Sequence, residues 1–140
     1  MIFFSSIHYV CSNCCNTTAF LNPYFGSSDG TSSVASFGYL EYVKLPAVVA
    51  WTTQFQYMFT NCNNLYKVVM PTSASSATNM VALFQGCINL LDVVIPSDAT
   101  GVTNMSSTFQ SCENLRTVSL PTSLNSCTTF LINSSSSVWR

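Results

Sequence analysis

The sequence predicts an α/β solenoid, a stack of short repeated units with a parallel β-sheet on one face and short helices on the other. The main support is an internal repeat at an offset of 25 residues without insertion, in which MFTNCNNLYKVVMPTSASSATNM is followed by LFQGCINLLDVVIPSDATGVTNM and then by TFQSCENLRTVSLPTSLNSCTTF. In each copy apolar residues first alternate, as in a strand, and then recur at helical spacing. A single copy cannot bury its apolar side, so neighbouring copies must stack around a shared core.

Each copy begins with a predicted strand. Three apolar columns recur at the repeat offset: Leu40, Leu65, Leu90 and Leu115; Val43, Val68, Val93 and Val118; and Leu45, Met70, Ile95 and Leu120. The second and third columns are two residues apart, which is the period of a strand. A proline ends each strand, because it has no amide hydrogen to donate. These prolines are Pro46, Pro71, Pro96 and Pro121. The repeats therefore span residues 40–64, 65–89, 90–114 and 115–139.

The second half of each copy predicts one to two turns of helix. Apolar residues lie at i, i+4, i+7 and i+10, which is helical spacing, in Met80, Phe84, Cys87 and Leu90. We expect polar residues in front of each helix to act as N-caps, at Thr78 or Asn79 and at Thr103 or Asn104. The chain leaves the helix at an asparagine, which tolerates the left-handed conformation that such a corner often needs, at Asn64, Asn89 and Asn114.

Two domains follow from the extent of the repeat. Residues 1–33 do not fit it, and we interpret them as an N-terminal arm or cap with a loop-like linker, FGSSDGTSS, at its end. Residues 34–140 form the solenoid, which opens with a partial copy. In the last copy Ser134 and Ser137 stand where earlier copies have Phe and Cys. Terminal repeats often depart from the pattern, because one side has no neighbouring copy.

The charge content argues against several classes of function. Only 6% of residues are charged and the formal net charge is -1, against about 25% charged residues in a typical domain. The four cations are too scattered to neutralise the phosphates of a nucleic acid or to bind an anionic membrane. No apolar run approaches the roughly 20 residues that span a bilayer, and the N-terminus lacks the basic start of a secretory signal.

The motif LxxVxLPxS…TxMxxxFxxCxNL resembles the BspA-type leucine-rich repeat, in the variant that carries TNM before FxxCxNL. The resemblance covers Leu40 to about Phe130. It implies a leucine-rich-repeat solenoid that is extracellular, on a cell surface or on a virion, and that serves adhesion or recognition. It implies no catalytic residues.

The outward positions of the strands are the candidate binding site. They form three columns, from which we select Tyr42, Lys44, Tyr66, Lys67, Val69, Leu91, Asp92, Val94 and Arg116. Lys67 and Asp92 fall in register on adjacent strands and predict a cross-strand ion pair. The apolar members predict an exposed patch, and such patches often mark contact sites. The alternative is that these residues are strand formers on a partly covered face.

The seven cysteines suggest two further candidate sites. Cys62, Cys87 and Cys112 form one column at an apolar helix position, so we interpret them as reduced core residues rather than disulfides. The group His8, Cys11, Cys14 and Cys15 has spacings compatible with zinc, although a disulfide or free thiols are the alternatives. Three segments fit the N-glycosylation pattern, at Asn16, Asn104 and Asn133, and Asn104 coincides with a predicted cap.

The sequence therefore predicts a non-enzymatic recognition or adhesion module. His8 is the single histidine, and neither paired carboxylates nor a phosphate-binding loop is present, so we expect no catalytic site and no cofactor. A protein or a glycan is the expected partner. The alternative is a structural subunit of a filament, coat or virion that self-assembles through its solenoid ends or its N-terminal arm.

Overall fold

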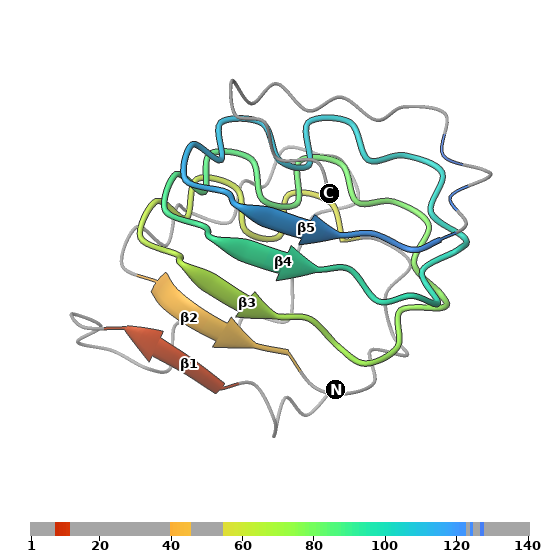
Figure 1. Ribbon diagram of the computed structural model, residues 1–140, viewed down its shortest axis with the longest axis horizontal. Helices are drawn as coiled ribbons and strands as arrows, with labels where there is room; N and C mark the ends of the chain where they lie inside the picture. The colour runs from red at the N-terminus through yellow and green to blue at the C-terminus, as the bar shows by residue number, and fades with distance from the viewer. Residues whose placement is uncertain (1–7, 12–39, 46–54, 123, 125–126, 128–140) are drawn as a thin grey trace.

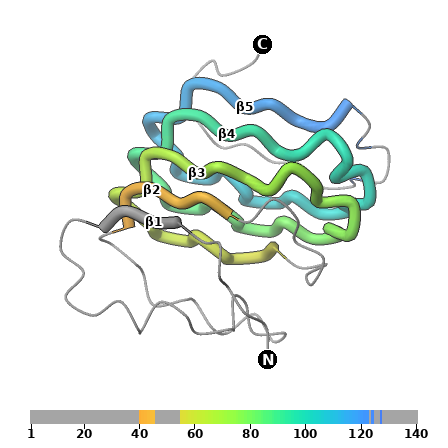
Figure 2. Tube along the Cα trace, turned by 90° about the horizontal axis from the view of Figure 1, so that it is seen from below, coloured from red at the N-terminus to blue at the C-terminus, as the bar shows by residue number. Residues whose placement is uncertain are grey.

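The described part of the chain folds around one five-stranded sheet, seen in the computed structural model in Figure 1. The structure describes residues 8–11, 40–45, 55–122, 124 and 127. The strands are β1 (His8–Cys11), β2 (Leu40–Lys44), β3 (Lys67–Val69), β4 (Asp92–Val94) and β5 (Thr117–Ser119), in that spatial order. We call the repeats at 40–64, 65–89, 90–114 and 115–139 coils 1 to 4. The described parts of these coils lie one above another (Figure 2), which fits the predicted solenoid.

Strands β2 to β5 are parallel, and each pairs with the strand one repeat away. Tyr42 pairs with Lys67, Lys67 with Asp92, and Asp92 with Thr117. The register is fixed by the alternation of the side chains, because a slip of one residue would turn the buried valines outward. Val68 and Val93 are 5% and 1% exposed, whereas their neighbours along the strand are exposed or half-buried.

Strand β1 covers the edge of β2 and runs antiparallel to it. Tyr9 pairs with Val43, and the register shifts between Val10 and Cys11. An uncovered edge strand presents unpaired amide and carbonyl groups that invite pairing with another chain. A segment of the predicted N-terminal arm thus provides backbone hydrogen-bond partners for one edge of the sheet.

The face opposite the sheet consists of turns, and the part of the chain that the structure describes contains no helix. We call residues 55–65, 80–90 and 105–115 the turn face. Here amides donate to the carbonyl three residues earlier, as in Gln85 to Ala82 (3.2 Å) and Cys87 to Phe84 (3.0 Å). The predicted helical face is therefore replaced by consecutive turns. None of the described residues belongs to a helix that could cross a membrane.

The physical reason is the spacing between coils. Helices pack about 8–10 Å apart, whereas strands lie about 4.8 Å apart. The turn face keeps close to the strand spacing: the rings of Phe59, Phe84 and Phe109 stack with centroids 5.6 and 5.8 Å apart. Every second amide then reaches the next coil, as in Ala82 to Ser106 (3.0 Å) and Phe84 to Thr108 (3.0 Å). A helix would use these amides internally.

The predicted caps act on these turns. Asn79 Oδ1 accepts a hydrogen bond from the amide of Val81 at 3.0 Å, and Asn104 Oδ1 accepts one from Ser106 at 2.9 Å. These are Asx turns, in which asparagine bonds to the amide two residues on. Positive φ angles occur inside the turn face, at Asn61 and Gly86 among others, and not at the predicted Asn64, Asn89 and Asn114.

Candidate functional site

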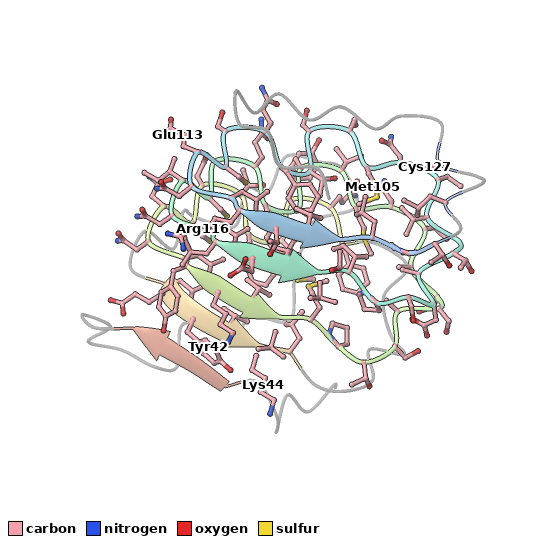
Figure 3. All side chains as sticks on the ribbon, viewed as in Figure 1. Tyr42, Lys44, Met105, Glu113, Arg116 and Cys127 are labelled. Carbon is pink, nitrogen blue, oxygen red and sulfur yellow. The ribbon has the colours of Figure 1, made fainter. Side chains whose placement is uncertain are left out.

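The sheet face, meaning the outward side chains of β2 to β5 and of the residue directly before each of β3 to β5, is organised around the central valine of each strand. Val43, Val68 and Val93 point into the core, so the residues on either side of them point outward. Tyr42, Lys44 and Arg116 are seen on this side of the sheet in Figure 3. All nine candidate residues lie on or beside β2 to β5. Backbone hydrogen bonds from the amide of Tyr66 to the carbonyl of Glu41 and from the amide of Leu91 to the carbonyl of Tyr66 join equivalent positions of successive coils.

Apolar and cationic side chains share this surface. Tyr66 is 43% and Val94 63% exposed, and they are the two exposed large hydrophobic residues in the described part of the chain. Val69 and Leu91 are half-buried beside them. Lys44, Lys67 and Arg116 are exposed. The face therefore offers hydrocarbon surface and positive charge together.

The predicted register of Lys67 and Asp92 is confirmed, but the ion pair is not found among the described residues. The Asp92 carboxylate instead accepts a hydrogen bond from the Thr117 hydroxyl on the next strand. Two exposed charges gain little from pairing in water, because solvent screens them and the side chains lose freedom. The Lys67 ammonium is thus left facing solvent.

A hollow of about 580 Å³ lies at the carboxyl ends of β3 to β5. Its lining is mostly apolar and includes Lys67, Val69, Asp92 and Val94, together with Met70, Pro71, Thr72, Ile95, Pro96, Ser97, Ser119 and Leu120. The proline and hydroxyl residues were not among the candidates from the sequence. The recurring prolines could have indicated this hollow from the sequence, because they mark where each strand ends and the chain bends away from the sheet.

The cysteine column is buried and reduced, as predicted. Cys62, Cys87 and Cys112 are free and at most 1% exposed. The Cys87 thiol donates a hydrogen bond to the carbonyl of Phe59 (3.0 Å), and that of Cys112 to Phe84 (3.1 Å). Burial raises the pKa of Cys112 to about 12 and also raises that of Cys87. These thiols are unsuited to nucleophilic chemistry, which requires the thiolate.

A model of the BspA type leucine rich repeat region (6 copies) matches residues 6–105 and 40–138. The chain belongs to this family. Comparison with curated proteins and with solved structures found no match. BspA-type repeats are modules for protein interaction or adhesion, are generally non-enzymatic and are typically surface-associated. The matched range begins at residue 6, upstream of the repeat columns that first indicated the family.

Two other candidates of this BspA-type chain fall partly or wholly outside the described residues. His8 and Cys11 belong to β1, whose side chains are not described, and Cys14 and Cys15 lie outside the described residues. The zinc or disulfide interpretation therefore stays a prediction. Asn16 and Asn133 also lie outside, while the side chain of Asn104 is bound to the amide of Ser106 in its own sequence motif. That contact favours a structural role for Asn104.

Proposed function

We propose that this chain is a recognition or adhesion module that binds a protein partner on its sheet face. The observation that supports this most directly is the placement of Tyr66 and Val94. Both are large apolar side chains that the fold leaves in solvent, Val94 on β4 and Tyr66 directly before β3. The core does not require them, because the inward columns are already buried from Leu40 to Leu115.

The two faces of the solenoid differ in a way that supports this choice. The exposed residues of the turn face are polar: Asn61, Asn63, Asn64, Asn89, Ser111, Glu113 and Asn114. Single exposed hydrophobic residues are common on soluble proteins, whereas apolar surface gathered on one face marks interaction sites. On the sheet face this surface adjoins the hollow.

Site-specific photocrosslinking tests the proposal. The chain is produced with a photoreactive phenylalanine derivative in place of Tyr66, in the cells or particles that carry it. Irradiation is expected to crosslink this position to a discrete partner protein. The control carries the same group at Glu113 on the turn face, which is also exposed. We expect no product, or a much weaker one, from that position. Equal capture from the two positions, or capture from Glu113 alone, would contradict the proposal.

A second candidate function, a subunit of a larger assembly, is favoured by the last coil. Val118, Leu120 and Leu124 are only partly buried, whereas Val93, Ile95 and Ala99 one repeat earlier are buried. A further coil or a second copy stacked on this end would complete their burial. Sedimentation over a wide concentration range tests this function, and a monomer at the highest concentration would exclude it.

A further inference from the structure

We propose that the sheet face binds an extended peptide segment in which an apolar side chain and a carboxylate lie two residues apart. The inference rests on the proposed function and adds the chemistry of the partner. The residues that carry it are Lys67, Val69 and Val94, which all line the hollow.

The apolar half of the site comes from both central strands. Val94 is 63% exposed and Val69 is half-buried, and the two residues occupy the same outward column of neighbouring coils. Pro71 and Pro96 line the hollow just beyond the strand ends and are themselves buried. An apolar side chain placed here would remove hydrocarbon on both partners from water. The described residues that line the hollow include no aromatic ring for a sugar to stack on, which favours a peptide over a glycan.

The charged half of the site comes from Lys67. Its ammonium has three donors and no acceptor, and the neighbouring Asp92 carboxylate is already bonded to Thr117. Lys67 and Asp92 contribute equal and opposite charges to the hollow, and the surrounding sheet face makes the balance positive, because Lys44, Lys67 and Arg116 against Glu41 and Asp92 give +1. An acidic group on the partner is therefore complementary to this face.

The spacing of the two halves sets the spacing in the ligand. Lys67 and Val69 flank the inward-pointing Val68, so they face outward two residues apart on β3. Residues i and i+2 of a strand are about 6.6–6.8 Å apart and share one side. An extended peptide has the same repeat, so an apolar residue and an acid at i and i+2 can meet Val69 and Lys67 together. An acid at i+1 would point away.

Matched synthetic peptides test the inference. Each has the same neutral Ser and Gly flanks around a central Leu-Ser-Asp, Leu-Asp-Ser, Leu-Ser-Asn or Leu-Ser-Lys, with blocked termini. They are titrated into the full chain, and the amide of Lys67 and the methyl groups of Val69 and Val94 are followed by nuclear magnetic resonance. We expect Leu-Ser-Asp to bind most tightly. Moving the acid or neutralising it should weaken binding about two- to fivefold, which is typical of one exposed charge pair, and Leu-Ser-Lys should bind most weakly.

Two variants assign the preference to the hollow. Lys67→Gln should make Leu-Ser-Asp and Leu-Ser-Asn bind equally. Arg116→Gln removes the same charge from the same face but lies outside the hollow, so it should keep the preference. The inference is overturned if the wild-type chain does not distinguish Asp from Asn, if Lys67→Gln still does, or if no peptide shifts Val94. Peptides that shift Val94 without regard to charge would overturn the acidic motif while leaving the sheet face a binding surface. Failure of the proposed function would instead be seen in the photocrosslinking experiment, as capture from Glu113 that equals capture from Tyr66 or occurs alone.

Discussion

At the residue scale, two columns of the turn face adopt left-handed backbone conformations. One contains Tyr57, Ala82 and Ser107, with φ of 58°, 51° and 56°, and the other Asn61, Gly86 and Ser111, with φ of 59°, 74° and 60°. Non-glycine residues pay about 1–2 kcal/mol for this region. In this conformation backbone amides point toward the next coil, and the amide of Gly86 donates a hydrogen bond to the carbonyl of Gln110 (2.8 Å). Hydrogen bonds between coils therefore offset the backbone strain.

We predict that Gly86→Ala destabilises the chain by about 1–2 kcal/mol, because alanine meets the left-handed penalty there. The new Cβ would also lie 2.4 Å from the Asn61 side-chain oxygen. Urea unfolding of Gly86→Ala alone and in an Asn61→Gly background separates these causes. Removing the Asn61 side chain should recover only the part of the loss due to the clash. A Gly86→Ala chain as stable as wild type would contradict the left-handed assignment.

A second prediction at this scale concerns Asp98. The amide of Ala74 (2.8 Å) and the hydroxyl of Ser73 donate hydrogen bonds to its carboxylate and lower its pKa. Its stabilising contribution is therefore complete above the ordinary aspartate pKa of about 3.9, and it is lost as the pH falls through the lower pKa of the folded state. Denaturation measured from neutral to acidic pH should show a smaller acid-induced loss for Asp98→Asn than for wild type. Identical pH profiles would show that this carboxylate does not link coils 2 and 3 as described.

At the scale of elements, the turn face is held by contacts between identical residues of successive coils. Gln85 bonds to Gln110 at 3.0 Å, Asn114 to Asn89 at 3.2 Å, and the Phe59, Phe84 and Phe109 rings stack. Each side chain in these columns thus contacts the same type of residue at the equivalent position of the next coil. This is why one conserved pattern inside a single chain can specify a whole face.

We predict that Phe84→Ala destabilises the chain by about 3–5 kcal/mol, the usual cost of emptying a large aromatic site in a core. Phe84 is fully buried at the centre of the stack, between Phe59 and Phe109. The matched control Phe84→Leu keeps much of the volume and should lose clearly less. Chemical denaturation monitored by intrinsic fluorescence measures both. Equal losses would indicate that the site collapses without leaving a cavity.

At the scale of the whole molecule, the repeat offset is the property on which the stack depends. Hydrogen-bonded pairs such as Asn89 and Asn114 are 25 residues apart. Coils of equal length keep every column in line on the sheet face and on the turn face at once. Stability should then be a sum of coil and interface contributions, as in other stacked-repeat proteins.

We predict that deleting residues 66–90 leaves a folded, shorter solenoid. This removes one whole repeat and joins Leu65 to Leu91, so all later columns keep their register. Its urea unfolding should remain cooperative with a smaller slope, because less surface is exposed on unfolding. Deleting residues 67–90 removes one residue fewer and turns the inward side chains of the junction strand outward. That chain should lose its cooperative transition. Similar unfolding of the two deletions would contradict a stack held in register.

The sequence alone determined the repeat, strands β2 to β5, the inward columns and the reduced cysteines. Each of these follows from local alternation and from like residues recurring at one offset, as with Val68 and Val93. It also indicated which side chains face outward on the sheet, because alternation fixes both sides of a strand at once.

Only the tertiary structure decided the character of the opposite face. The spacing of Met80, Phe84 and Cys87 is compatible with a helix, but neighbouring coils lie too close for helices to stack, so turns bonded to the next coil replace them. In the structure the Asp92 carboxylate accepts a hydrogen bond from Thr117 instead of forming the predicted ion pair with Lys67. The prolines that follow β3 and β4 line a shared hollow. These features depend on distances between coils, which no single repeat encodes.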